Sequence, residues 1–398
     1  MNKRIMVLGA ARGQLGLIKS IKNNGDIAIA ASIKGNYPGI SIADEFCEVD
    51  IVDREAVARK AKEYKVDAIT TCCHDIAIGA LGYACHQNGL VGLSPKSAQI
   101  SNDKFLMKTA FMKSGVNTAK FKEVHSKDEL KSVASELTFP LIIKAIDLQG
   151  SKGIYIVKNN MELYSNYEKV MQDTNKDFCI VEEFIKGEEF GAQAFIVNGE
   201  ILYVMPTGDI TYLSNTNVPI GHYVPFDVDS KLLKKIEEQV ELAIRAIGLD
   251  NCAVNVDLIL KDGKVYVIEL TGRVGANCLP ELSSIYYGVD IYKMIYLTAL
   301  GNDTAKYFLQ HKSKQNTPCY AMMLISEKSG KLKRIVNNND MTDERIVQIC
   351  FFVNEGDEIR KFRNSSDCIG QVIVKGESLE FCKGFVEKVI DNISYEIE

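Results

Sequence analysis

The chain has 398 residues, of which 46% are hydrophobic and 25% are charged. This is an ordinary globular composition, with enough length for two or three domains. The formal net charge of −5 at pH 7 gives no overall attraction for phosphate backbones or anionic membranes. The densest basic run, Lys331 to Arg334, is most simply a solvated surface stretch. We therefore expect neither nucleic acid nor a membrane as a partner.

The amino terminus and the cysteines favour a cytoplasmic location. The apolar stretch from Ile5 to Leu8 is far too short for a signal-peptide core or a membrane span. Most of the 11 cysteines lie inside apolar runs, without CxxC or Cys/His metal spacing. Cys72 and Cys73 are adjacent, and neighbours on a strand point to opposite faces, so they are poorly placed for a disulfide. Reduced core thiols are the natural interpretation.

The amino-terminal region, residues 1–95, has the pattern of an open parallel sheet. Short apolar runs alternate with helical patterns from Lys3 to about Pro95, which is typical of βαβ units. The glycine-rich stretch from Gly9 to Gly16 lies where the first strand turns into the first helix, but it lacks the GxGxxG spacing. Two interpretations stay open: a turn that packs helix on strand, or a small-ligand site at the carboxyl ends of the strands.

A boundary near Leu93 to Pro95 precedes a helix predicted from about Ser97 to Ser114, which ends at Gly115. Next come the apolar run Pro140 to Ala145, a glycine loop at residues 149–153 and a strand from Ile154 to Val157. The order strand, glycine loop, strand is typical of a hairpin lid.

The following stretch contains two more predicted strands, Phe178 to Ile185 and Phe190 to Val197. A weakly patterned polar loop is predicted from Gly208 to Pro225. Apolar residues three or four apart then predict a helix from about Ser230 to Ile247.

A hairpin is predicted after that helix, because Lys261-Asp262-Gly263 is a strong turn signal. Its strands are Cys252 to Leu260 and Lys264 to Leu270. Beyond about residue 300 we expect a mixed α/β segment, with strands at Cys319 to Leu324 and Gln371 to Val374 and a final helix from Ser378.

The charged residues suggest a site for a nucleoside triphosphate, which needs lysines, a glycine loop and acids for Mg²⁺. Each feature alone has a plainer explanation: a surface lysine, an ordinary turn, or a carboxylate paired with arginine. Their occurrence together in one order favours the nucleotide site. The candidates in chain order are Lys104, Lys144, the loop Gly150, Ser151, Lys152 and Gly153, and the acids Asp257 and Glu269.

Residues 101–273 resemble the ATP-grasp fold. With its flanking regions, the chain resembles biotin carboxylase and glycinamide-ribonucleotide-synthetase-like enzymes. The resemblance implies a chain of mixed α/β and α+β class. It implies an open-sheet domain at residues 1–95, an ATP-grasp domain at 96–300 with its lid at about 120–190, and a carboxyl-terminal α/β segment at 301–398.

The resemblance also implies roles for individual residues. The lysines and the glycine loop would hold the phosphates, and the two acids would bind Mg²⁺, with Mn²⁺ as an alternative. Thr271 stands where the family usually has asparagine and offers only one hydroxyl oxygen. The linker Glu182, Glu183 and Ile185 would meet adenine through the Glu182 side chain and the Ile185 backbone, Glu189 would bind the ribose, and Arg273 would face the phosphoryl group and the substrate.

By this resemblance the chain is an ATP-dependent ligase that converts a carboxylate to an acyl phosphate and couples it to an amine. Both substrates would be small molecules, and a homodimer is among the assemblies considered. Amino-acid or dipeptide ligation is favoured over a purine-biosynthesis ligase of the phosphoribosylglycinamide synthetase type. Two other classes stay open, namely a catalytically silent nucleotide-binding module and a dinucleotide-binding oxidoreductase. The glycine spacing opposes the oxidoreductase.

The acceptor pocket is the least defined part of the site. His74 and Asp75 follow a strand of the first domain, and Asn277 follows the metal hairpin, so all three are candidates for contact with substrate. His222, in the predicted loop, is a weaker candidate. For each of them a polar loop residue is the alternative.

Overall fold

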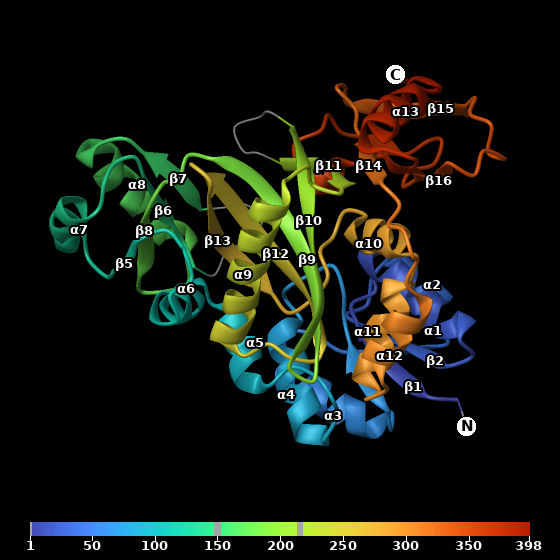
Figure 1. The fold of residues 1–398 in the computed structure, drawn as a ribbon, viewed down its shortest axis with the longest axis horizontal. Helices are drawn as coiled ribbons and strands as arrows, with labels where there is room; N and C mark the ends of the chain where they lie inside the picture. The colour runs from blue at the N-terminus through green and yellow to red at the C-terminus, as the bar shows by residue number, and fades with distance from the viewer. Residues whose placement is uncertain (1, 147–152, 213–217) are drawn as a thin grey trace.

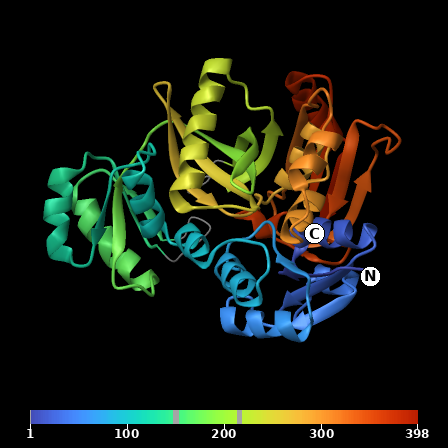
Figure 2. The ribbon, with the colours of Figure 1, turned by 60° about the horizontal axis from the view of Figure 1, so that its bottom comes forward.

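The computed structural model describes residues 2–146, 153–212 and 218–398. The predicted phosphate-loop residues Gly150, Ser151 and Lys152 therefore lie outside the described residues. The described residues form an amino-terminal parallel sheet, a small lid sheet at one side, a long central sheet and a small sheet near the carboxyl terminus (Figure 1). Figure 2 shows the lid standing apart from the rest of the molecule. The expected mixed α/β and antiparallel architecture is confirmed.

The amino-terminal sheet has the strand order β3-β2-β1-β4, and all its strands are parallel. This confirms the prediction from βαβ alternation, since parallel neighbours need helical crossovers. Its apolar strands are almost fully buried. The elements are β1 Arg4–Leu8, α1 Leu15–Asn23, β2 Ile27–Ser32, α2 Pro38–Ile42, β3 Glu45–Glu48, α3 Arg54–Glu63, β4 Ala68–Thr70 and α4 Ile78–Asn88.

The glycine turn after β1 is filled by the protein's own side chains. Gly9 has φ +103, and a Cβ there would lie 2.4 Å from His74 Nε2. The Gln14 amide donates to the Cys72 carbonyl oxygen at 2.6 Å. A Cβ on Gly16 would lie 2.3 Å from the ring of Tyr292 on α11 (Ile291–Ala299). The glycines thus serve close packing, which favours the packing interpretation and opposes a dinucleotide site.

The helix predicted from Ser97 to Ser114 is in fact two helices, α5 (Pro95–Asn102) and α6 (Lys104–Lys113). Asp103 between them is extended, and its side chain accepts hydrogen bonds from the backbone N–H groups of Phe105 and Leu106. An aspartate at this position caps a new helix more favourably than it continues the old one. Lys104 consequently starts α6.

The lid is an antiparallel sheet with the order β5-β8-β6-β7. The predicted hairpin is confirmed as β6 and β7, and the predicted strand from Phe178 is shorter, since β8 ends at Glu183. The lid has its own apolar core, separate from that of the central sheet. Its elements are β5 Phe121–Val124, α7 Leu130–Glu136, β6 Leu141–Lys144, β7 Ile154–Val157, α8 Asn160–Asp173 and β8 Cys179–Glu183.

The central sheet has eight strands in the order β13-β12-β9-β10-β11-β14-β18-β16. The hairpin of β12 and β13 is confirmed, with positive φ at Asp262 and Gly263 in its turn. The helix α9 (Ser230–Ile247) is also confirmed, and its apolar side packs into the core. The first strands in chain order are β9 Glu188–Val197, β10 Glu200–Tyr212, β11 Val218–Val224, β12 Cys252–Lys261 and β13 Lys264–Thr271.

The polar loop predicted from Gly208 to Pro225 is wrong, because β10 and β11 occupy most of it. Asp209 and His222 interrupt the apolar pattern, yet they lie opposite each other in the strand register and are in contact. Gly208 packs directly against the ring of Tyr223. The contact between the polar residues Asp209 and His222 therefore conceals the strand pattern.

The carboxyl-terminal residues extend the central sheet through the pairing of β11 with β14. The strands predicted near 319 and 371 and the helix starting after Ser378 are confirmed, but β19 follows that helix. A separate small sheet has the order β17-β15-β19. The elements are α10 Leu279–Tyr287, α11 Ile291–Ala299, α12 Thr304–His311, β14 Cys319–Leu324, β15 Gly330–Asn337, β16 Ile346–Phe351, β17 Glu358–Ile359, β18 Gly370–Lys375, α13 Leu379–Asp391 and β19 Ile393–Ile397.

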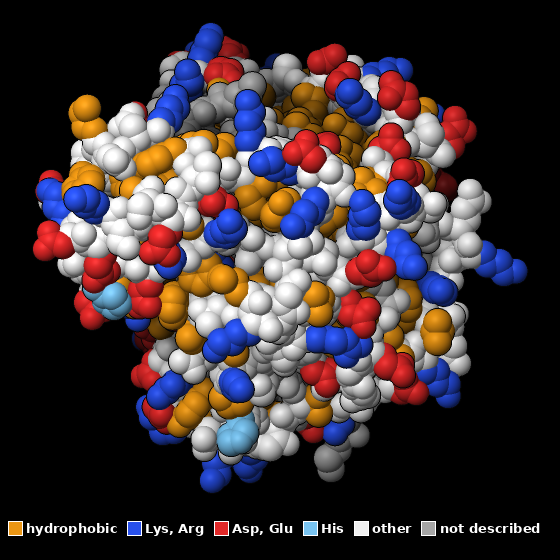
Figure 3. Space-filling view, turned by 60° about the vertical axis from the view of Figure 1, so that its left-hand side comes forward, with side chains coloured by type: hydrophobic (Ala, Val, Ile, Leu, Met, Phe, Trp, Pro, Cys, Tyr) orange, Lys and Arg blue, Asp and Glu red, His pale blue; other side chains and the backbone are white. Residues whose placement is uncertain are grey.

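Among the helices described, none is both long and apolar enough to cross a membrane. Figure 3 brings the lid side of the molecule forward and shows basic and acidic side chains interspersed over that face.

We expect Gly16→Ala to destabilise the protein by about 1–3 kcal/mol, because the added methyl group overpacks the contact with Tyr292. Gly384→Ala is the matched control. It lies inside α13, where a Cβ would meet nothing within 4 Å, so alanine should stabilise by about 1 kcal/mol. Urea unfolding monitored by circular dichroism measures both. Equal stability of the two variants would contradict the packing role of Gly16.

Candidate functional site

One face of the central sheet carries a row of polar side chains near the lid. In the strand register Asn255 lies between Gln193 on β9 and Thr271 on β13, and Asp257 lies opposite Glu269. Because strand side chains alternate between faces, these residues project to the same side. They form a polar floor on an otherwise apolar sheet.

The two predicted metal ligands are brought together. The Asp257 side chain keeps contact with solvent. Desolvation by the surrounding protein, and then the nearby charge of Glu269, raise the pKa of Asp257 to about 7, although Arg273 opposes the shift. A desolvated carboxylate that faces a second carboxylate is stabilised by a cation between them. Lys104 Nζ lies 3.7 Å from Glu269 Oε1 and supplies one positive charge.

The donor set fits Mg²⁺. Carboxylate oxygens are the ligands that this hard cation prefers, and it commonly takes one or two of them together with phosphate oxygens. The buried Thr271 Oγ1 has no hydrogen-bond partner, which suits a hydroxyl that faces a ligand. The described residues contain no cluster of three His, Cys, Asp or Glu side chains placed to hold a metal alone. A nucleotide would have to complete the coordination.

The predicted phosphate lysine Lys144 belongs to a buried ion triad that the sequence did not reveal. Lys108 Nζ and Lys144 Nζ each lie 2.5 Å from a different oxygen of Glu182. All three side chains are at most 6% exposed. Burial opposes ionisation of Glu182, but the two lysines outweigh it and lower its pKa to about 2. Both carboxylate oxygens of Glu182 already contact lysines. The contact of Glu182 with adenine stays a prediction.

Lys108 was missed because a lysine inside an apolar helix pattern is usually assigned to the surface. It follows Lys104 by four residues, so both lie on one side of α6. The four-residue spacing from Lys104 is the sequence signal that could have identified Lys108. Lys108 also donates to Thr118 Oγ1 at 3.3 Å, and burial lowers its own pKa despite the charge of Glu182.

The remaining predicted nucleotide residues lie on different elements. Glu183 accepts a hydrogen bond from the Thr138 N–H at 3.2 Å. Ile185 is buried in a small apolar cluster, and Glu189 is exposed near the start of β9. The Gly153 carbonyl oxygen accepts from the Ala145 N–H at 3.1 Å, so the ends of the glycine loop lie together.

Two exposed isoleucines on β7 were also missed. Ile154 pairs with Lys144 in the register, and Ile156 pairs with Ile142, so both share the lid face that carries Lys144. Their exposed fractions are 38% and 51%. Apolar side chains beside a phosphate lysine form a surface suited to a flat aromatic ring.

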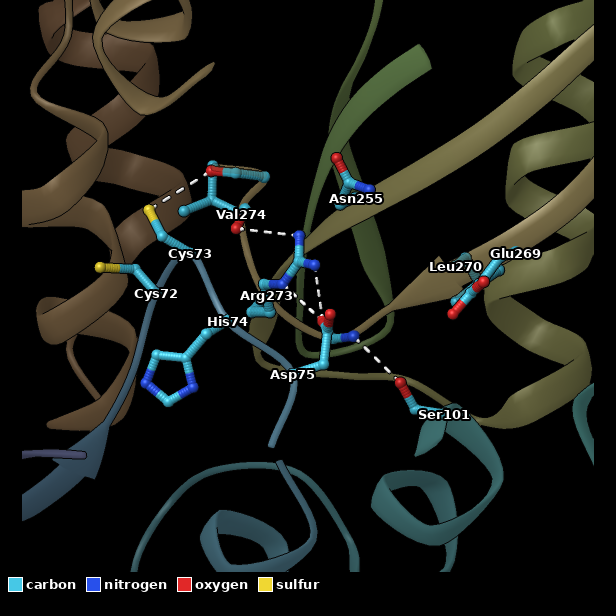
Figure 4. A network of polar contacts seen from close by, with 12 residues as sticks. Cys72, Cys73, His74, Asp75, Ser101, Asn255, Glu269, Leu270, Arg273 and Val274 are labelled. Atoms are coloured by element: carbon cyan, nitrogen blue, oxygen red, sulfur yellow. Dashed lines mark hydrogen bonds and ion pairs between the residues drawn. The ribbon is translucent and has the colours of Figure 1, made fainter. Parts of the chain in front are cut away.

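Two predicted substrate-side residues meet in an ion pair. Arg273 Nε and Nη2 lie 2.7 and 2.6 Å from Asp75 Oδ1, and Arg273 Nη1 donates to the Val274 carbonyl oxygen at 3.3 Å (Figure 4). The pair joins the first domain to the segment after β13. Just before Arg273, the Gly272 N–H donates to Ser101 Oγ at 3.2 Å, which ties α5 to the same segment.

The other predicted substrate residues are not gathered at this ion pair. His74 turns away from Asp75 in Figure 4, and its Nε2 lies 3.1 Å from the Leu8 carbonyl oxygen. Burial lowers the pKa of His74, which favours a neutral, structural ring. Asn277 has φ +54 in the loop before α10. His222 Nδ1 lies 2.7 Å from Asp209 Oδ1.

Two family models match the chain. The ATP-grasp (A) domain of phosphoribosylglycinamide synthetase matches residues 102–275, and L-amino acid ligase C-terminal domain 2 matches residues 322–398. The chain is 48% identical to a crystal structure described as phosphoribosylglycinamide synthetase from Anaerococcus prevotii, with a TM-score of 0.89 and 100% of both chains covered.

Other similarities are more distant. An L-amino acid ligase from Bacillus licheniformis has the same fold, with 18% identity, a TM-score of 0.82 and coverage of 100% and 99% of the two chains. Alanine–anticapsin ligase of Bacillus subtilis is 26% identical over 265 residues, 61% of this chain. A formate-dependent phosphoribosylglycinamide formyltransferase of Bacteroides thetaiotaomicron is 28% identical, with 68% and 70% covered. The chain spans 55% of the alanine–anticapsin ligase.

We expect Asp257→Asn to stabilise the metal-free protein at pH 8 more than at pH 5. The folded-state pKa of Asp257, about 7, exceeds the unfolded value of about 3.9, so the wild type loses stability as pH rises between them. Asparagine removes that penalty. Thermal unfolding in chelator at both pH values measures the effect. Glu200→Gln, on an exposed carboxylate, is the control. If Asp257→Asn changes the unfolding temperature by the same amount at both pH values, the raised pKa of Asp257 is contradicted.

We expect Glu182→Gln to cost about 3–5 kcal/mol, because it leaves two buried lysines without a counter-charge. Adding Lys108→Met should recover part of the loss, since it removes one of those charges. Hydrogen exchange of the lid and urea unfolding measure both variants. Glu136→Gln, in an exposed lid ion pair with Lys122, should change little. Additive losses in the double variant would show that the triad is not coupled.

Proposed function

Because the chain belongs to the ATP-grasp family of ATP-dependent carboxylate–amine ligases, we propose that it uses ATP to convert a small carboxylate to an acyl phosphate. An amine then displaces the phosphate, and ADP and phosphate are released. The observation that carries this proposal is the facing pair Asp257 and Glu269, with Lys104 3.7 Å from Glu269. Phosphoryl transfer relies on such positioned charges more than on covalent catalysis by the protein.

The nucleotide would lie between the lid and the polar floor. Lys104, Lys144 and the loop at residues 150–153 would offset the phosphate charges. The exposed lid face with Ile154 and Ile156 would cover the adenine, together with the predicted linker contacts. Closure of the lid would exclude water, which would otherwise hydrolyse the acyl phosphate.

Asp257, Glu269 and Thr271 would hold Mg²⁺, or Mn²⁺ as the alternative. When bound, the cation supplies electrophilic stabilisation of the charge on the transferring phosphoryl group. Arg273 would orient the substrate carboxylate for in-line attack, because its planar guanidinium matches two carboxylate oxygens. Asp75 would hold the arginine in place.

For the substrates we favour an amino acid as the carboxylate donor and a second amino acid as the amine. The match of residues 322–398 to an L-amino acid ligase domain supports this choice, as does the similarity to alanine–anticapsin ligase. The second candidate is a ligase of the phosphoribosylglycinamide synthetase type, which the 48% identical relative favours by its description. A homodimer remains a prediction; one biotin carboxylase with the same fold is described as a dimer.

Release of ADP from MgATP over pairs of amino acids tests the proposal. Amino-acid ligation predicts stimulation by two amino acids and detection of the dipeptide by mass spectrometry. Phosphoribosylglycinamide is the amide of glycine with phosphoribosylamine, so the second candidate predicts stimulation only by that pair. The absence of stimulation by any pair, with ATP still bound, would favour a silent nucleotide-binding module.

We expect Glu269→Gln to lower ADP release by about a hundredfold or more while the fold stays intact. The amide removes one of two charges for the cation, and such charge stabilisation is worth several kcal/mol. Steady-state ADP release and circular dichroism measure the two effects. Glu238→Gln on the exposed side of α9 should be as active as the wild type. Undiminished activity of Glu269→Gln would remove the metal assignment.

A further inference from the structure

One member of the polar floor is a buried amide. Gln193 on β9 is 1% exposed, and both ends of its side-chain amide are engaged. Its Oε1 accepts a hydrogen bond from the Gly275 N–H at 2.8 Å. Its Nε2 donates to Asn255 Oδ1 at 2.7 Å and to the Ala192 carbonyl oxygen at 3.2 Å. A buried glutamine satisfied at both ends is held in one orientation.

The hydrogen bonds continue from Asn255 to the metal-facing acid. Asn255 Nδ2 donates to Asp257 Oδ1 at 3.1 Å. The direction of the whole chain is fixed at the Gly275 end, because the Gly275 N–H can only donate. Each amide must therefore turn its oxygen toward Gly275 and its NH₂ group toward Asp257.

The loop at residues 273–278 depends on the same contacts. A Cβ on Gly275 would lie 2.5 Å from Asn255 Oδ1 and 3.1 Å from Gln193 Nε2, so the backbone sits directly on the two amides. On its other side the Val274 carbonyl oxygen accepts from the Cys73 N–H at 3.2 Å. The loop is thus clamped between the sheet and the first domain.

We infer that Gln193 and Asn255 form an amide relay that positions Asp257 and the Arg273 loop relative to each other. The inference rests on the proposed function, in which Asp257 holds the cation and Arg273 holds the substrate. Asn255 engages one oxygen of Asp257 and leaves the other free for the cation. Gln193 fixes the distance of the loop from the sheet. Neither amide is a catalytic residue, since both act through the groups they orient.

A purely structural role is the alternative. Loss of a buried hydrogen bond would then lower stability without a selective effect on cation-dependent binding. The relay predicts a selective effect, because residues that orient metal ligands commonly contribute ten- to a hundredfold in metal affinity or activity. The two roles are separable by comparing ADP binding with and without Mg²⁺.

The test uses Gln193→Leu and Asn255→Ser, with calorimetric titration of ADP in Mg²⁺ and in chelator. We expect each variant to lose about tenfold in the Mg²⁺-dependent part of the affinity and to bind ADP in chelator as the wild type does. The kcat for ADP release should fall by a similar factor. Asn88→Ala is the control, because it removes amide hydrogen bonds to Ala58 and Ala84 far from the site.

Gln193→Glu separates the two arms of the relay. Its carboxylate keeps an acceptor for the Gly275 N–H but loses the donor to Asn255, so Asn255 must turn its oxygen toward Asp257. We expect the Mg²⁺-dependent affinity to fall at least as far as in Gln193→Leu. This variant retains the loop contact, so it and Asn255→Ser stand in for Gln193→Leu if that variant fails to fold.

The outcomes separate this inference from the proposed function. If Mg²⁺ does not enhance ADP binding by the wild type, the metal assignment and the relay fail together. If Mg²⁺ enhances binding by the wild type and equally by the folded variants, with wild-type kcat, the relay alone is overturned. Equal weakening of ADP binding with and without Mg²⁺ would assign the amides a structural role and would also overturn it.

Discussion

The antiparallel pairing of β12 and β13 imposes the constraint around which the site is organised. Its register sets Asp257 directly opposite Glu269, where desolvation and the nearby charge of Glu269 raise the pKa of Asp257 and a cation between the two side chains would favour its ionised form. Lys104 provides part of the compensation at the edge of the pair. The rest must come from a ligand, so the electrostatics of the floor suit a cation that arrives with phosphates. Holding the two carboxylates together lowers the stability of the protein without a ligand, and binding of a cation would recover that free energy.

The lid meets a different electrostatic requirement with its own residues. Glu182 offsets one of the two positive charges of Lys108 and Lys144, which come from α6 and β6, so one buried carboxylate ties the helix before the lid to the lid sheet. Removing one partner of such a buried ion group strongly destabilises the protein. The intact group nevertheless adds little net free energy of folding. Its value lies in holding Lys144 at a fixed place on the lid. A phosphate group that approaches Lys144 therefore meets an oriented charge.

Local signals predicted the elements whose residues satisfy local rules, such as the turn at Asp262 and Gly263 and the helix α9. Elements whose polar or charged residues have partners distant in sequence were harder to predict. Polar residues at 209 and 222 broke the apolar alternation of β10 and β11, and the cap at Asp103 divided a helix that has a continuous pattern. Lys108 was missed because its partner Glu182 is distant in sequence. No local rule could reveal the contact between Gln193 and Gly275, which joins residues 82 positions apart.

The Asp75–Arg273 ion pair shows how the domain interface and substrate binding can share one side chain. A guanidinium has five N–H donors, and contacts with Asp75 and Val274 engage three of them within the described part of the chain. Two donors remain for a carboxylate, so a substrate can bind without displacing Asp75. An arginine held by one carboxylate is also already ordered, which reduces the entropy lost when it binds a second. In the proposed function the first domain would thus contribute to substrate binding by fixing Arg273, and the glycine turn that packs against Tyr292 helps to fix the first domain.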